Sequence, residues 1–249
     1  MNAEIIAVGS ELLTPARLDT NSLFLTAQLN DLGIEVVQKT VVGDDRARLT
    51  AAVRTALDRC EIVILTGGLG PTEDDITREA VAAALDRELV FCPEIVEAIE
   101  RRFRRMGRKM AEINKRQAYV IAGAEPLAND NGTAPGQWIE DAGRVVVLLP
   151  GPPPELNPMF IRDCLPRLQR LVPPLAIRTL VFRVAGMPDK VQIRRRDHHQ
   201  VKSAQHLLLP SDLLRCLGHV CLLRGSRRPR LTRPLHRAGH VAGPMEGSR

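Results

Sequence analysis

Glycines and acids gathered behind one apolar run are the residues of this sequence best suited to chemistry. Residues 62–65 (Ile-Val-Ile-Leu) read as a buried strand, Gly67, Gly68 and Gly70 follow it, and a helix is expected to begin near Asp75. Glycine lets the backbone approach a ligand closely, and the unpaired N–H groups of a helix start attract anions. The segment therefore predicts a phosphate-binding loop.

The consecutive acids Glu73, Asp74 and Asp75 allow two interpretations. Thr72 and Asp75 have the spacing of a capping box, so the acids can serve only to start the helix. Alternatively, a divalent cation bound by Asp74 and Asp75 offsets their mutual repulsion and bridges to a phosphate. The segment lacks the Lys-Ser/Thr ending of a P-loop and the G-x-G-x-x-G spacing of dinucleotide loops, so it belongs to neither class.

The run Thr-Gly-Gly-Leu-Gly-Pro-Thr at 66–72, with Asp-Asp-Ile-Thr at 74–77, resembles the signature of the CinA family. The N-terminal domain of that family has the MoaB/MogA molybdopterin-binding fold, and further motifs agree from Glu4 to about Phe160. The resemblance implies an α/β fold of three α/β/α layers around a mostly parallel sheet. It also implies contacts to the substrate from Thr66, Gly67, Gly68, Gly70 and Thr77.

A second acidic turn follows the predicted strand at 34–42 and leads into a helix predicted from about residue 46 to residue 59. Asp44 and Asp45 stand at its carboxyl end, where α/β sheets place their ligands, so both are candidate catalytic acids together with Asp74 and Asp75. A turn followed by an N-cap explains Asp44 and Asp45 equally well. The alternation of strands and helices in this half of the chain indicates parallel strands with helices on both faces of the sheet.

Two later motifs match the family, and a third segment extends the predicted pocket. The pair at 114 and 117 resembles its Asn-x-x-Gln-Ala element and would offer amides to a base or ribose from one side of a helix. The loop at 129–136 matches its Gly-Thr-Ala-Pro-Gly motif, although Asn-Gly alone is also a common hairpin turn. The strand at 145–149 leads into a second glycine loop and helix. These segments supply the remaining predicted substrate-binding residues, namely Asn114, Gln117, Asn131, Gly132, Thr133, Pro150, Gly151 and Glu155.

Charge is unevenly divided along the 249 residues. The net charge is +6, yet residues 190–249 hold 13 of the 35 Lys and Arg and only 3 of the 29 Asp and Glu, so the rest of the chain is mildly acidic. Within that acidic part, the arginines at 101–108 are interpreted as a solvated helix face, with steering of an anionic substrate as the alternative.

Cysteine usage and hydropathy bear on the compartment. The five cysteines are an odd number without a C-x-x-C pair, which is typical of reduced thiols. The sequence contains no apolar run of membrane-spanning length, and its first residues have no basic region of a signal peptide. We therefore expect a cytoplasmic protein without a membrane partner.

The expected organisation has three parts: a nucleotide-binding domain at 1–165, a linker and the first strand of a second domain at 166–189, and a basic tail at 190–249. The alternation of residues 176–184 predicts that strand. The acid-poor tail is interpreted as frameshifted sequence with little structure. A nucleic-acid arm is disfavoured because the tail has no aromatic residue for stacking, and a zinc site at 216–221 matches no common spacing. The amidase domain that often follows in the family is expected to be absent.

The resemblance implies metal-dependent hydrolysis of a nucleotide diphosphate such as ADP-ribose. A divalent metal ion, held by Asp74 and Asp75, is the expected cofactor. The expected partner is a phosphorylated small molecule, either a nucleotide or a pterin, with no nucleic acid, and the family further implies a homo-oligomer. Two alternatives stay open: molybdopterin binding with adenylyl transfer, and a non-catalytic nucleotide-binding remnant of a longer protein.

Overall fold

The computed structural model describes residues 1–172, 178–181 and 192–195. The first half of the described chain alternates strands and helices. Its elements are β1 (Asn2–Val8), the 3-10 helix η1 (Ser10–Leu13), α1 (Thr20–Asp31), β2 (Glu35–Val42), α2 (Arg46–Arg59), β3 (Ile62–Thr66) and α3 (Thr77–Ala84). The predicted parallel βα alternation of this half is confirmed.

The second half adds a separate two-stranded antiparallel sheet and the antiparallel edge strands and last parallel strand of the main sheet. Its elements are β4 (Leu89–Phe91), α4 (Pro93–Arg105), the 3-10 helix η2 (Glu112–Ala118), β5 (Tyr119–Ile121), β6 (Glu125–Leu127), β7 (Gly136–Asp141), β8 (Arg144–Leu149), α5 (Pro153–Met159), the π-helical turn η3 (Phe160–Cys164) and α6 (Leu165–Leu171). Strands β4 and β5 pair with each other rather than with the six-stranded sheet.

The main sheet has the strand order β2-β1-β3-β8-β7-β6. Strands β2, β1, β3 and β8 run parallel, while β7 and β6 are antiparallel additions at one edge. In this register Val8 lies beside Val42, and Thr66 lies beside Leu149. The carboxyl ends of four neighbouring strands therefore meet at one edge of the sheet, which is where such folds bind ligands.

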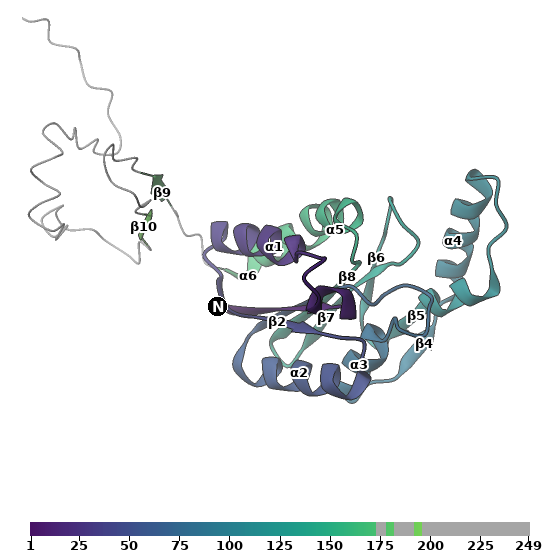
Figure 1. Cartoon of the computed structure of the whole chain (residues 1–249), viewed down its shortest axis with the longest axis horizontal. Helices are drawn as coiled ribbons and strands as arrows, with labels where there is room; N and C mark the ends of the chain where they lie inside the picture. The colour runs from purple at the N-terminus through teal and green to yellow at the C-terminus, as the bar shows by residue number, and fades with distance from the viewer. Residues whose placement is uncertain (173–177, 182–191, 196–249) are drawn as a thin grey trace, which may run out of the picture. The chain divides into compact units, whose positions relative to one another are not determined.

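Two apolar clusters, one on each face of the sheet, hold the layers together (Figure 1). On one face α2 and α3 pack through residues such as Leu49 and Val81, which are fully buried. On the other face α1, α5, η3 and α6 pack through residues such as Leu25 and Phe160. The fold is the three-layer α/β/α arrangement that the sequence predicted.

The first domain extends beyond the predicted end at residue 165. Leu168 of α6 is fully buried in the cluster beneath α1 and α5. Arg167 forms two hydrogen bonds with Glu125 of β6, at 2.7 and 2.6 Å, and its guanidinium lies 5.3 Å from the ring centre of Trp138. Because these contacts tie α6 to the sheet, the domain includes residues up to Val172.

Beyond this domain the structure describes only two short strands, β9 (Arg178–Val181) and β10 (Gln192–Arg195), which pair antiparallel. β9 falls within the strand predicted at 176–184. β10 falls within the tail, where the sequence predicted no persistent element, and it supplies the hydrogen-bonding partner that a lone strand lacks. The remaining predictions for the tail, including the zinc and nucleic-acid interpretations, lie outside the described residues.

Candidate functional site

A crevice of about 800 Å³ opens at the carboxyl ends of β1, β2, β3 and β8. Its walls come from the loops that follow these four strands, together with Gln117 of η2 and Thr133 and Ala134 of the loop before β7. This volume falls within the range of about 300–1,000 Å³ that small-molecule sites occupy. Since β3 and β8 are paired neighbours, their two glycine loops face the same crevice, as predicted.

The glycine loop after β3 presents backbone N–H groups selectively. Gly67 and Gly68 have φ angles of 93° and 64°, a conformation that favours glycine. The Gly67 N–H donates to the carbonyl of Leu149 at 3.0 Å, and the Gly70 N–H donates to Asp75 at 2.8 Å. Within the described residues the N–H groups of Gly68, Leu69 and Gly151 donate to no acceptor. These three amides of the two glycine loops are available to a bound anion.

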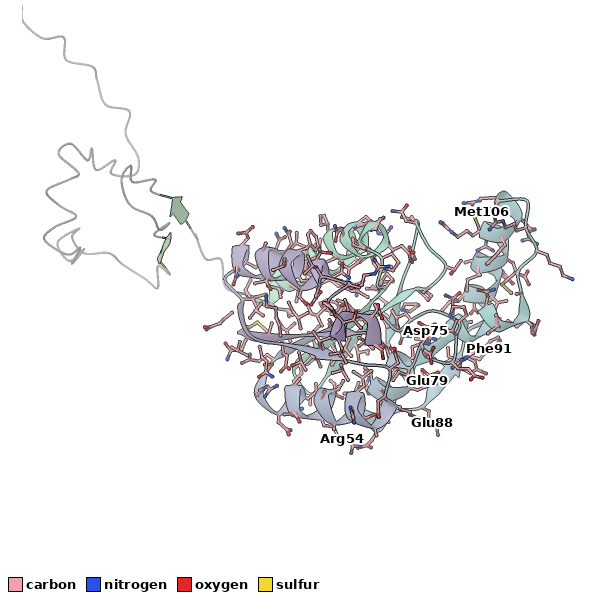
Figure 2. The ribbon with its side chains drawn as sticks, in the orientation of Figure 1. Arg54, Asp75, Glu79, Glu88, Phe91 and Met106 are labelled. Atoms are coloured by element: carbon pink, nitrogen blue, oxygen red, sulfur yellow. The ribbon has the colours of Figure 1, made fainter. Side chains whose placement is uncertain are left out.

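Asp75, labelled in Figure 2, is engaged by its own loop. One carboxylate oxygen accepts the Gly70 N–H, and the other accepts the Thr72 N–H at 2.9 Å and the Thr72 hydroxyl at 2.5 Å. The predicted relation between Thr72 and Asp75 is thus present, but it closes a turn before α3 rather than the first turn of the helix, which begins at Thr77. Asp74 is exposed and makes no hydrogen bond or ion pair within the described chain.

The crevice is strongly acidic. One cation, Arg17, lines it, against six carboxylates from Glu11, Asp19, Asp44, Asp74, Asp75 and Glu155. Four of these acids have structural partners: Asp75 accepts the loop donors described above, Asp19 accepts the N–H of Ser22 to cap α1, Asp44 accepts the N–H of Ser10, and Glu155 accepts the side-chain amide of Asn129. A phosphate group would be repelled by this set of charges unless a cation accompanied it.

Two buried side-chain oxygens of the crevice lack a hydrogen-bond donor. Asn21 donates its amide to the carbonyl of Gly151 at 2.7 Å, which leaves its Oδ1 buried without a partner. Gln117 is 2% exposed, and its Oε1 is also unpartnered. A buried acceptor without a donor costs roughly 1–3 kcal/mol, so both atoms favour a ligand that carries N–H or O–H groups.

Most of the predicted site residues meet in this crevice. Those that line it are Asp44, Asp74, Asp75, Thr66, Gly67, Gly68, Gly70, Gln117, Thr133, Pro150, Gly151 and Glu155. Sequence reasoning did not single out Glu11 or Arg17, which also line it. Their loop after β1 becomes part of the site only through the parallel pairing of β1 with β2 and β3.

Five predicted residues lie outside the crevice lining. Asp45 caps α2 by accepting the N–H of Arg48, and Asn114 turns back to the carbonyl of Ala111. Thr77 lies behind the glycine loop and donates to the carbonyl of Gly67 at 2.8 Å. In the loop at 129–136, Asn131 donates to the carbonyl of Pro154, and Gly132 borders a second cavity.

The second cavity, of about 470 Å³, separates α4 from the loop at 126–135. Arg101, Arg102 and Arg105 line it, and Arg102 donates to the carbonyl of Asp130. The arginine-rich helix therefore turns part of its charge toward a groove, and the rest of that charge stays on an exposed face.

A preformed metal cage is absent among the described residues, where no three His, Cys, Asp or Glu side chains are placed to hold an ion. Mg²⁺, however, is commonly bound by one or two carboxylates together with substrate phosphates and water. The uncommitted carboxylate of Asp74 beside the free amides fits that mode of binding.

The fold and crevice define a molybdopterin-binding-like α/β domain, and residues 4–170 match the family described as "Probable molybdopterin binding domain". Within that class the chain belongs to the CinA family. It is similar to the crystal structure of "the protein CinA with unknown function" from Thermoplasma acidophilum, with 31% identity and a TM-score of 0.61 over 65% of this chain and 95% of that chain.

Two curated relatives, both called CinA-like protein, are similar at higher identity. The relative from Solibacter usitatus is 65% identical over 189 residues, which are 76% of this chain and 45% of that protein. The relative from Acidobacterium capsulatum is 41% identical over 251 residues, which cover 99% of this chain and 60% of that protein. The chain thus spans about half the length of the curated relatives it matches.

Proposed function

We propose that this domain hydrolyses the diphosphate of a nucleotide such as ADP-ribose, with a divalent cation bound between the substrate and Asp74. The observation that carries the proposal is the pairing of opposite features in one crevice: unpaired amides that suit phosphate oxygens, and an excess of carboxylates that suit a cation. The amides alone do not explain the carboxylates, and the carboxylates alone do not explain the unpaired amides, whereas a phosphate bound together with a cation explains both.

Different residues of the crevice bind different parts of the substrate. The N–H groups of Gly68, Leu69 and Gly151 hold phosphate oxygens, where fixed dipoles stabilise the charge that develops during hydrolysis. The acceptors of Asn21 and Gln117 receive donors from the base or ribose. When bound, the cation supplies Lewis-acid polarisation of the diphosphate and a more acidic water.

Asp75 has a different role from Asp74 in this proposal. Its two oxygens already accept three donors from Gly70 and Thr72, so it fixes the shape of the loop and contributes to the cation only through its remaining lone pairs. Asp44 is a further carboxylate that lines the same crevice, and it can orient water.

The test is incubation of the purified chain with ADP-ribose in the presence of Mg²⁺ or of excess EDTA, with the products separated by ion exchange. Attack of water on the diphosphate yields AMP and ribose 5-phosphate in equal amounts, and EDTA should abolish both. Turnover that persists in EDTA would remove the cation from the proposal, and no turnover with any divalent metal would remove the hydrolysis.

Molybdopterin binding is the second candidate, and the family description favours it directly. A phosphorylated pterin also presents an anion together with ring N–H donors, so the same amides and acceptors suit it. Calorimetric titration with molybdopterin and with ADP-ribose, each with and without Mg²⁺, separates the two. Tight binding of the pterin with no hydrolysis of ADP-ribose would make this the function of the crevice.

A further inference from the structure

Six consecutive carbonyls of the glycine loop, those of residues 67–72, are held from behind by three residues. Thr77 donates its hydroxyl to Gly67 at 2.8 Å and its N–H to the Gly68 carbonyl at 3.1 Å. Arg78 donates to the carbonyls of Leu69 and Gly70 at 2.6 and 2.9 Å. Arg116 of η2 donates to the carbonyls at 71 and 72, at 3.5 and 2.8 Å.

The bonds from Thr77 to the loop carbonyls fix the direction of the loop N–H groups that face the crevice. A peptide unit is planar and trans, so its carbonyl and the N–H of the next residue point in opposite directions. Holding the carbonyls of Gly67 and Gly68 behind the loop turns the N–H groups of Gly68 and Leu69 away from Thr77. These are two of the three unpaired amides at the crevice.

Burial of the charged guanidinium of Arg78 costs free energy, because the group is removed from water. Arg78 is 1% exposed, its Nε has no partner, and burial lowers its pKa from the ordinary arginine value, while Glu79 and Asp75 oppose the shift. A buried charge of this kind is retained where its hydrogen bonds are needed. Its two bonds to loop carbonyls are the contacts it makes within the described chain.

Arg116 connects the loop with another wall of the crevice. It also approaches Glu79 of α3 at 3.5 Å, and the next residue, Gln117, lines the crevice with its unpartnered oxygen. Arg116 therefore ties the far end of the glycine loop, at residues 71 and 72, to the short helix that carries Gln117.

We propose that Thr77, Arg78 and Arg116 are positioning residues for the phosphate groups of the ligand, which they do not touch. Thr77 orients the Gly68 and Leu69 amides directly, and Arg78 and Arg116 fix the part of the loop that follows these amides. The proposal rests on the proposed function in taking the anion to be a substrate diphosphate. We call these three residues the clamp. The proposal predicts that loss of one hydrogen-bond donor of the clamp weakens anion binding, even though each donor lies behind the loop.

The test is calorimetric titration with inorganic pyrophosphate and Mg²⁺, well below the melting temperature of every variant. Thr77→Val and Arg116→Met should each weaken binding about tenfold or more, because amides displaced from the anion lose charge-assisted hydrogen bonds. Thr77→Ser keeps the hydroxyl and should bind like the wild type. Because Arg78 is buried and its variants are prone to misfold, the near-isosteric Thr77→Val and the substitution of the half-buried Arg116 carry the experiment.

Arg87→Met is the matched control. Arg87 also donates to two carbonyls, those of Ala122 and Glu140, and pairs with Asp141 at 2.7 Å, but it does not line the crevice. Its variant should lose stability and keep the affinity of the wild type. Equal weakening in Arg87→Met, or unchanged affinity in both Thr77→Val and Arg116→Met, would overturn the clamp.

The same titrations separate this inference from the proposed function. A wild type that binds pyrophosphate in a clamp-dependent way but leaves ADP-ribose intact would remove the proposed function and keep the clamp. A wild type that binds neither pyrophosphate nor ADP-ribose would overturn both.

Discussion

Asp74 and Asp75 are neighbours in the chain with opposite surroundings. Asp74 is exposed and uncommitted, whereas Asp75 accepts three hydrogen bonds within its loop. The sequence alone treated both as metal ligands of equal standing. The structure separates an acid that is free to bind a cation from one that shapes the loop.

The pair can be tested with Asp74→Asn and Asp75→Asn. Asp74→Asn should keep the melting temperature and lose Mg²⁺-dependent turnover, because only the charge facing the cation is removed. Asp75→Asn should lose about 1–3 kcal/mol of unfolding free energy as well, since an amide NH₂ then faces an N–H donor of the loop. Thermal melts and turnover with ADP-ribose measure both effects. Unchanged stability in Asp75→Asn would show that its three bonds contribute nothing.

Gly68 and Gly151 form a second pair of contrasting residues. A Cβ at Gly68 would overlap the Thr77 hydroxyl and would sit at a φ of +64°, whereas a Cβ at Gly151 would meet only the Gly67 Cα, at 3.5 Å. Gly68→Ala should therefore destabilise the domain by about 1–2 kcal/mol and weaken ligand binding. Gly151→Ala should fold normally. Equal melting temperatures for the two variants would contradict the strain assigned to Gly68.

The residue types of the site could be predicted from the sequence, but their directions could not. Glycines and acids after a strand indicated a phosphate loop, and Gly68 and Gly151 line the crevice. Which amides stay unpaired depends on Leu149, which is distant in sequence and pairs with the Gly67 N–H, and on the side of the loop from which Thr77 bonds its carbonyls. No local pattern contains such partners.

At the level of helices and strands, the spacing of apolar residues predicted an element well where the spacing continued over several turns. The helix predicted at 46–59 is α2 with the same limits, because Leu49, Val53 and Ala56 recur at helical spacing and face the sheet. The seven residues of η2 form a 3-10 helix, which is too short for a period to define. Asn114 turns back to the carbonyl of Ala111, and of the two amides only that of Gln117 lines the crevice.

Cysteine reactivity can check how these elements pack. Cys60 ends α2 and Cys164 belongs to η3, and both thiols are buried. Burial raises the pKa of Cys60 and raises that of Cys164 to about 12, so at pH near 8 roughly one Cys164 thiol in 10⁴ is ionised. Cys92, at the start of α4, is half-buried.

In the native protein, iodoacetamide should therefore modify Cys92 before it modifies Cys60 or Cys164. In denaturant all three thiols should react. Peptide mass mapping at successive times measures this order. Raising the pH should increase the native reaction of Cys164 only slightly, because burial limits access as well as ionisation. Early modification of Cys164 would mean that η3 does not pack as described.

For the molecule as a whole, the similarity to one relative includes the tail at 190–249, whereas the similarity to another spans only 189 residues. The similarity to the Solibacter relative spans 189 residues, whereas that to the Acidobacterium relative spans 99% of the chain. If the tail is frameshifted, the DNA after codon 189 read in another frame should encode an acid-containing α/β sequence. Sequencing that region and translating its three frames is sufficient, and two frames without such a sequence would return the tail to consideration as a selected segment.

The extent of the independent domain provides the last prediction. A chain ending at Val172 should keep the melting temperature of the full-length protein's first transition and its affinity for pyrophosphate. A chain ending at Leu165 loses the buried Leu168 and the contacts of Arg167 with Glu125 and Trp138. Removal of one buried leucine costs about 3 kcal/mol, which lowers the melting temperature of a domain of this size by roughly 10 °C.

Differential scanning calorimetry of the two truncated chains measures the contribution of α6. The pH dependence adds a second check, because the hydrogen bonds from Arg167 lower the pKa of Glu125. A lowered carboxyl pKa contributes stability above the unfolded value, and that contribution is lost as the pH falls through the folded value. The longer chain should therefore lose more stability on acidification than the shorter one. Equal melting temperatures at neutral pH would instead place the end of the domain before α6, because they would show that the sheet needs no cover from Leu168.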